Sequence, residues 1–244
     1  MLSSKQTYAN LGLSVSTSFR LLRTAVFYCL LIPSVILFVG CSSQDKQSPE
    51  AAPTTTTTAL PTSSPATASN QKLKFKRSGG IKAFALKPDV DGVQLVNGNN
   101  KELAWFEVDD GPKVKIKNTT DQVIGYIVIK NGIWQVKNAD ETKNLYILRR
   151  QDNGNYQLED GANREIYEIK AREYGLEIES PNQQSLYQVK VKNGKISLRN
   201  ASAKMVLYTK SQLTPIAIAC FGFDVLSQEQ QAALAYAVKL SGDR

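Results

Sequence analysis

The sequence predicts a mainly β fold: an antiparallel up-and-down meander of about 12 strands that closes into a barrel and is followed by two helices. Three observations predict it. Glycines recur from Gly111 to Gly194 at steps of 21, 22, 21 and 19 residues. Apolar and polar residues alternate between these glycines, which is typical of strands that have one buried face. After Thr214 the alternation gives way to an unbroken apolar run.

The repeat is clearest around Asn193-Gly194, where residues 188–192 and 195–199 alternate on either side of the turn. Asn-Gly suits a tight hairpin turn, which needs two residues with positive φ. We expect five such hairpins between Leu103 and Lys210 and a sixth from Leu73 to Val96. The sixth hairpin fills its strand positions with Phe75, Ile81, Phe84 and Leu86. A two-sheet sandwich is the alternative, but a constant period favours a closed meander, which has no edge strands.

Two helices are expected after the last strand. Thr214-Pro215 is a typical helix start, and residues 216–223 are apolar on every side, so this helix must be buried inside the barrel or against it. Ser227 with Gln230 predicts a capping box that opens a short amphipathic helix through Leu240. The residues expected to share its apolar face are Leu226, Leu234, Ala237 and Leu240.

Residues 1–40 have the layout of a secretory signal peptide. Arg20 and Arg23 precede an apolar stretch, and the small residue Gly40 precedes Cys41. The apolar stretch is short for a stable membrane span, although an uncleaved signal anchor is the alternative. Residues 42–71 are rich in Thr, Pro and Ser and contain one large apolar residue, so we expect a disordered tether.

Phe38-Val39-Gly40-Cys41 resembles the lipobox of bacterial lipoproteins. The resemblance implies cleavage before Cys41 and a diacylglycerol on its sulfur, which anchors the protein stably to a membrane. It also implies a place in the bacterial cell envelope, facing the periplasm or the exterior. The expected domains are then the signal peptide at 1–40, the lipidated cysteine with its tether at 41–71, and the barrel with its helices at 72–244.

A series of about 12 antiparallel strands followed by an apolar helix resembles the tubby-like superfamily, which includes the phospholipid scramblases and the LURP-one-related proteins. The resemblance covers Leu73 to about Leu240. Besides the hairpins it rests on Pro215–Leu226, where Ala219-Cys220-Phe221 and Asp224 are similar to the terminal helix of the scramblases. It implies a barrel closed around this helix. No phosphoinositide-binding motif matches residue by residue, so it implies no site.

Catalytic chemistry is not indicated, and we expect a protein that is not an enzyme and needs no cofactor or metal. The chain has no histidine, the commonest general base and zinc ligand. Two carboxylate pairs occur, Asp109-Asp110 and Asp89-Val90-Asp91-Gly92. The second pair lacks the further oxygen ligands of a calcium loop, so a solvated turn is expected. A hydrolase that uses paired carboxylates is kept as an alternative.

The chain carries a formal net charge of +8, and part of this charge is concentrated in two places. The first basic cluster contains Lys72, Lys74, Lys76, Arg77, Lys82 and Lys87, and a second basic hairpin contains Lys190, Lys192 and Lys195. The residues expected to bind an anionic surface are Lys74, Lys76, Arg77, Lys82, Lys190 and Lys192. The first interpretation is that lysines solvate and protect strand faces. The second is that they attract anionic lipid headgroups. Nucleic acid is a poor partner for a protein outside the cytoplasm.

These patterns favour a membrane-anchored envelope lipoprotein that presents a non-enzymatic binding module. Its expected partners are the membrane, through lipidated Cys41, and either an anionic lipid or an envelope protein. The alternative function is a scaffold that holds an envelope complex together. The sequence predicts neither the oligomeric state nor which membrane is occupied.

Overall fold

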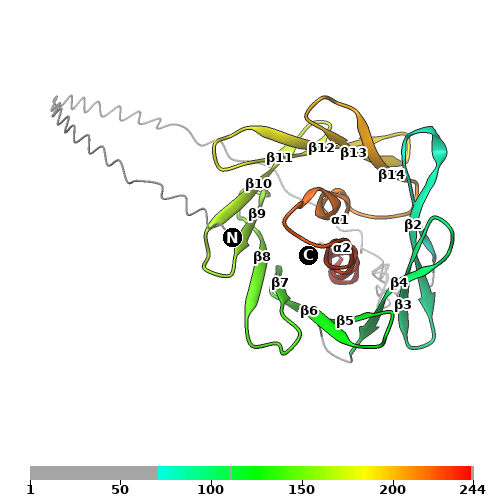
Figure 1. Ribbon diagram of the computed structural model, residues 1–244. Coiled ribbons are helices and arrows are strands. Elements are labelled where there is room, and N and C mark those ends of the chain that lie inside the picture. Colours follow the sequence, from blue (N-terminus) through cyan, green and yellow to red (C-terminus); the bar gives the residue numbers. More distant parts are fainter. Residues whose placement is uncertain (1–70, 110–111, 243–244) are drawn as a thin grey trace, which may run out of the picture. The chain divides into compact units, whose positions relative to one another are not determined.

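The computed structural model describes residues 71–109 and 112–242, which belong to the compact unit Pro61–Arg244. The predicted signal peptide, Cys41 and the tether up to residue 70 lie outside the described residues. The described part is a closed antiparallel β barrel of 14 strands around two short helices (Figure 1). The strands are β1 (Leu73–Lys76), β2 (Lys82–Asp89), β3 (Gly92–Asn97), β4 (Glu102–Val108), β5 (Lys113–Asn118), β6 (Val123–Lys130), β7 (Ile133–Lys137), β8 (Asn144–Arg150), β9 (Tyr156–Asp160), β10 (Glu165–Arg172), β11 (Gly175–Glu179), β12 (Ser185–Lys192), β13 (Lys195–Asn200) and β14 (Met205–Thr209).

Each strand pairs with its neighbours in sequence, and β1 pairs with β14 to close the barrel. The predicted closed antiparallel meander is therefore confirmed, with 14 strands in place of about 12. The two extra strands are the short β1 and β14 at the ends of the sheet. Ile81 was expected within a strand, but it follows a 3-10 turn, η1 (Ser78–Gly80), and its side chain is 65% exposed. Gly79 and Gly80 have φ of 76° and 80°, so they turn the chain and separate β1 from β2.

The turns at the two ends of the barrel differ in chemistry. At the end that we call the glycine end, hairpins turn at positions such as Asn131-Gly132 and Asn193-Gly194, all four with positive φ, as predicted. At the opposite end, the Asx end, an Asn or Asp side chain closes most turns. For example, Asn118 Oδ1 accepts hydrogen bonds from the amides of Thr120 and Gln122, both at 3.0 Å. Asn97, Asn138, Asp160 and Asn200 begin the corresponding turns.

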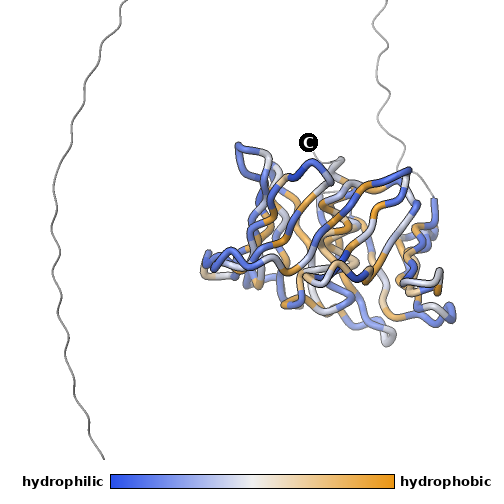
Figure 2. The backbone as a smooth tube through the Cα atoms, turned by 90° about the horizontal axis from the view of Figure 1, so that it is seen from above, coloured by the Kyte–Doolittle hydropathy of each residue, from blue (hydrophilic) through white to orange (hydrophobic). Residues whose placement is uncertain are grey.

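Helices fill the barrel. Both α1 (Pro215–Ala219) and α2 (Gln228–Ser241) lie inside the ring of strands, with the 3-10 turn η2 (Cys220–Gly222) after α1 (Figure 1). Apolar residues alternate along the strands, and the turns at both ends are mostly hydrophilic (Figure 2). The largest fully buried side chain is Trp134 of β7, whose Nε1 donates a hydrogen bond to Ser241 Oγ at 3.1 Å. The end of α2 is thereby attached to the barrel wall.

The start of α2 follows the sequence prediction, since Ser227 with Gln230 forms the predicted capping box. Pro215 occupies the first turn of α1 as predicted, but the side chain of Thr214 makes no capping hydrogen bond. The body of α2 differs from the amphipathic helix that was expected, because its charged and amide side chains lie in the first and last turns and no residue from Ala232 to Ser241 is exposed. Leu226 precedes the helix. In the described part of the chain, no helix has the length and apolar character needed to cross a membrane.

Candidate anion-binding face

Two stretches of the barrel contain no acidic residue. The first, residues 71–88, forms β1 and most of β2, and the second, residues 180–223, forms β12, β13 and β14. Because β1 pairs with both β14 and β2, these five strands lie side by side in the wall of the barrel. We call their outer surface, with the connection between β1 and β2, the basic face. Its basic residues are Lys72, Lys74, Lys76, Arg77, Lys82, Lys87, Lys190, Lys192, Lys195, Arg199, Lys204 and Lys210.

One row of paired residues crosses the whole basic face. Lys82 pairs with Lys76, Lys76 with Tyr208, Tyr208 with Ser197, and Ser197 with Lys190. Paired residues in an antiparallel sheet point to the same side. Lys190, Ser197 and Tyr208 alternate along their strands with buried core residues such as Val189, Leu198 and Leu207, so the row lies on the outer side of the sheet, although Ser197 itself is only 3% exposed. The closure of the barrel thus places the two basic clusters of the sequence within five strands of each other.

Like charges lie directly opposite each other on this face. Lys76 pairs with Lys82, and Lys192 pairs with Lys195. Directly opposed like charges destabilise an antiparallel sheet. Within the described ranges, no carboxylate lies within ion-pair distance of these four lysines. The repulsion is relieved in part by neutral partners, since Lys82 Nζ donates to Asn100 Oδ1 at 2.9 Å and Lys195 Nζ lies 5.4 Å from the centre of the Tyr208 ring.

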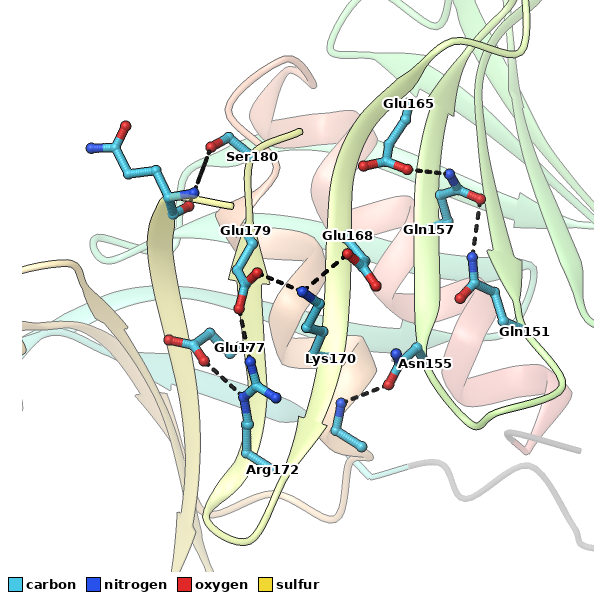
Figure 3. A network of polar contacts seen from close by, with 12 residues as sticks. Gln151, Asn155, Gln157, Glu165, Glu168, Lys170, Arg172, Glu177, Glu179 and Ser180 are labelled. Atoms are coloured by element: carbon cyan, nitrogen blue, oxygen red, sulfur yellow. Dashed lines mark hydrogen bonds and ion pairs between the residues drawn. The ribbon is translucent and has the colours of Figure 1, made fainter. Parts of the chain in front are cut away.

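The wall formed by β9, β10 and β11 differs from the basic face because its basic side chains form ion pairs with carboxylates. Lys170 Nζ lies 2.8 Å from Glu179 and 3.2 Å from Glu168, and Arg172 bridges Glu177 and Glu179 at 2.8 Å each (Figure 3). The hydrogen bond to Glu179, followed by that to Glu168, raises the pKa of Lys170. Lys170 and Arg172 therefore each have carboxylate partners, unlike the opposed lysines of the basic face. Like charges also meet in this wall, since Glu159 pairs in register with Glu165 and Glu168 with Glu179.

The wall at β4 and β5 contains ion pairs as well. Glu107 is paired in register with Lys115, at 2.7 Å, and also contacts Lys117 at 2.9 Å. Hydrogen bonds from Lys115 and then Lys117 lower the pKa of Glu107. A carboxylic acid that donates a proton in catalysis needs a raised pKa. The lowered pKa of Glu107 therefore does not suit it to act as a general acid. Asp109 also lies near Lys113, at 3.4 Å, and its sequence neighbour Asp110 lies outside the described residues.

Two hollows in the basic face offer room for a ligand. One of about 320 Å³ lies along β1 and β14, and another of about 440 Å³ lies along β12 and β13; both reach Lys210. Lys74, Lys76 and Tyr208 line the first hollow. Burial, followed by repulsion from Lys87, Lys82 and Lys74, lowers the pKa of Lys72 beside them. The field around this hollow therefore favours an anion.

The structure brings together the residues that the sequence singled out. Lys74, Lys76 and Lys82 lie on the β1–β2 part of the basic face, Lys190 and Lys192 on β12, and Arg77 precedes η1. Sequence reasoning missed Tyr208, Ser197 and the contribution of Lys210. The absence of acidic residues from 180 to 223 was a signal that could have indicated them.

A third cavity, of about 490 Å³, opens at the glycine end between the β2–β3 turn and the end of α2. It contains the carboxylates of Asp89, Asp91 and Glu107 together with Lys239. Asp89 Oδ1 accepts a hydrogen bond from the amide of Val90 at 2.8 Å, as in an ordinary tight turn. Among the described residues, no group of three or more His, Cys, Asp or Glu could hold a metal ion.

No family model and no curated protein matches the chain. Among solved structures, an X-ray structure of a protein from Arabidopsis thaliana is similar, with 12% sequence identity and a TM-score of 0.34. The similarity covers 57% of this chain and 80% of that chain. A likeness this weak has no bearing on the site.

Proposed function

We propose that this chain is a membrane-anchored lipoprotein of the bacterial cell envelope and that its barrel is a non-enzymatic module that binds anionic lipid headgroups. The observation that carries the proposal is the basic face, in which Lys76 opposes Lys82 and Lys192 opposes Lys195. Among the in-register pairs of the described strands, lysine opposes lysine on this surface alone. A negatively charged bilayer offsets the repulsion between these lysines and attracts each basic residue at its surface by about 1 kcal/mol.

The proposal also includes the lipid anchor at Cys41 and a tubby-like fold for the barrel. Lipidation of Cys41 keeps the barrel near a bilayer, and a tether up to Gln71 lets the basic face turn toward it. The tubby-like resemblance is supported by a closed barrel with an apolar helix at its centre. The barrel departs from that resemblance in having 14 strands and in holding α2 in its interior as well.

The experiment compares two double variants of the fragment 61–244. This fragment contains every strand, and each strand is hydrogen-bonded to two neighbours, so we expect it to fold alone. Lys76→Glu/Lys190→Glu changes the central row of the basic face. Lys130→Glu/Lys143→Glu makes the same change in net charge on β6 and just before β8, across the barrel. Circular dichroism verifies that both variants fold.

Co-sedimentation with vesicles gives the readout, using phosphatidylcholine alone or with phosphatidylglycerol at low salt. The fragment is expected to bind the anionic vesicles, and Lys76→Glu/Lys190→Glu to weaken binding at least about 30-fold, since two lysines contribute about 1 kcal/mol each. The control double variant should bind much better than this. Equal losses in the two variants would mean that only net charge matters, and the basic face would lose its role. No binding at low salt would contradict lipid recognition and leave the scaffold function.

A further inference from the structure

The connection between β1 and β2, residues 77–81, presents an apolar side chain within the basic face. The amide of Arg77 donates to the carbonyl of Ile81 at 2.8 Å, and the amide of Gly80 donates to the carbonyl of Arg77 at 3.1 Å. These two hydrogen bonds close a compact tip. The Ile81 side chain is 65% exposed there, although isoleucine is among the residue types most often buried.

A single exposed apolar residue needs no functional explanation by itself. The residues around Ile81 therefore determine whether its exposure indicates a binding site. Ile81 lies between Arg77 and Lys82, and the nearest acidic residue along the strand is Asp89 at the other end of β2. A second exposed apolar residue, Val206 at 40%, lies at the start of β14, against which η1 packs. Apolar side chains surrounded by basic ones form the arrangement that binds the boundary between headgroups and acyl chains.

Val90 is the internal contrast. It is 94% exposed, which makes it the most exposed large apolar side chain among the described residues. It lies in the β2–β3 turn at the glycine end, between Asp89 and Asp91. Two carboxylates beside it would be repelled by anionic headgroups. Ile81 and Val90 are thus both exposed at opposite ends of β2. The neighbours of Ile81 are basic and those of Val90 are acidic, so the sign of the local charge distinguishes the two positions.

We propose that Ile81 inserts into the acyl boundary of an anionic bilayer when the basic face docks on it. The inference rests on the proposed function and adds a contact point: the basic face lies against the membrane along its strands, with the β1–β2 tip inserted. Lys76, Arg77 and Lys82 bind the headgroups around the inserted side chain. Gly79 and Gly80 carry no side chain, so the tip stays narrow enough to enter between headgroups.

The test uses the full-length chain reconstituted into vesicles, with Ile81→Cys labelled by an environment-sensitive nitrobenzoxadiazole dye. Val90→Cys with the same dye is the matched control. The parent chain treated with dye gives the background from Cys29, Cys41 and Cys220, of which Cys220 is fully buried. In phosphatidylglycerol-containing vesicles the dye at position 81 should shift to shorter emission wavelength and be quenched by lipids brominated on the acyl chains. The dye at position 90 should show neither effect, and pure phosphatidylcholine should give neither effect at either position.

Acetylation of Lys76, followed by mass spectrometry, separates failure of this inference from failure of the proposed function. If anionic vesicles protect Lys76 while the dye at position 81 stays in water, docking occurs without insertion and the inference is overturned alone. If Lys76 is not protected, both proposals are overturned. Equal quenching at positions 81 and 90 would also overturn the inference, because the tip would then have no special role.

A substitution without a dye gives an independent measurement. Ile81→Asn removes an exposed apolar side chain, so the barrel should keep its stability while the affinity of the fragment 61–244 for anionic vesicles falls about tenfold. Val90→Asn should leave this affinity unchanged. An unchanged affinity for Ile81→Asn would overturn the inference.

Discussion

Phe221 lies in the η2 turn inside the barrel and packs against β1, the strand that closes the barrel by pairing with β14. Its ring centre lies 5.0 Å from that of Phe75 on β1 and 5.1 Å from that of Phe84 on β2. Phe221→Ala removes a side chain that is 9% exposed, together with both aromatic contacts. Truncation of a buried phenylalanine costs about 3–5 kcal/mol, and each aromatic pair contributes about 0.5–1.5 kcal/mol of such a loss. We predict that the free energy of unfolding falls by about 3–4 kcal/mol.

The same substitution should loosen the closure selectively. The register between β1 and β14 contains two pairs, Phe75 with Thr209 and Lys76 with Tyr208. A further hydrogen bond joins Thr209 Oγ1 to the carbonyl of Lys74 at 2.8 Å. Because this junction is short, it depends on the packing of Phe75 against the interior. Amide hydrogen exchange in β1 and β14 should therefore accelerate more than in the remaining strands.

Denaturant unfolding and hydrogen exchange by mass spectrometry measure the two effects. Phe223→Ala is the control, since Phe223 is fully buried and stacks on Tyr167 of β10 at 5.8 Å. It should cost a similar free energy of unfolding while accelerating exchange around β10. If both variants accelerate exchange in β1 equally, or if Phe221→Ala costs less than about 1 kcal/mol, the link between the interior and the closure is refuted.

Two further predictions concern Tyr187 and Lys192. Burial, and then hydrogen bonding to Asp224, raises the pKa of Tyr187 to about 12, so its contribution to stability is complete below pH 10 and is lost as pH rises toward 12. Thermal unfolding between pH 9 and 12 should therefore show a loss of about 1 kcal/mol after solvent screening, and Tyr187→Phe should reduce this loss. Lys192→Glu replaces opposed like charges with an opposite-charge pair at Lys195, so it should stabilise the fold by about 0.5 kcal/mol while weakening vesicle binding. Reduced stability of this variant, or undiminished binding, would contradict the cost assigned to the lysine pair.

The sequence predicted the hairpins well because their determinants are local. Alternation and an Asn-Gly turn are both read within about ten residues, as around Asn193-Gly194. The strand count was wrong at the two ends, where β1 has four residues and pairs with β14 from the far end of the chain. Nothing local marks such a pairing. The second turn series, from Asn97 to Asn200, was local and readable, but only the glycines were used to place turns.

The residues of the basic face could be predicted from the sequence, but their arrangement on one surface could not. Both basic clusters are visible in the sequence, but their adjacency requires the closure of β1 on β14. Before closure is known, lysines on strands have an ordinary explanation as solvated, edge-protecting residues. A closed barrel has no edges to protect, so edge protection no longer applies to Lys74 and Lys76, and solvation of the strand face remains as their ordinary explanation. Opposed lysines then remain as a cost to the fold, and a negatively charged partner is the simplest agent that offsets it.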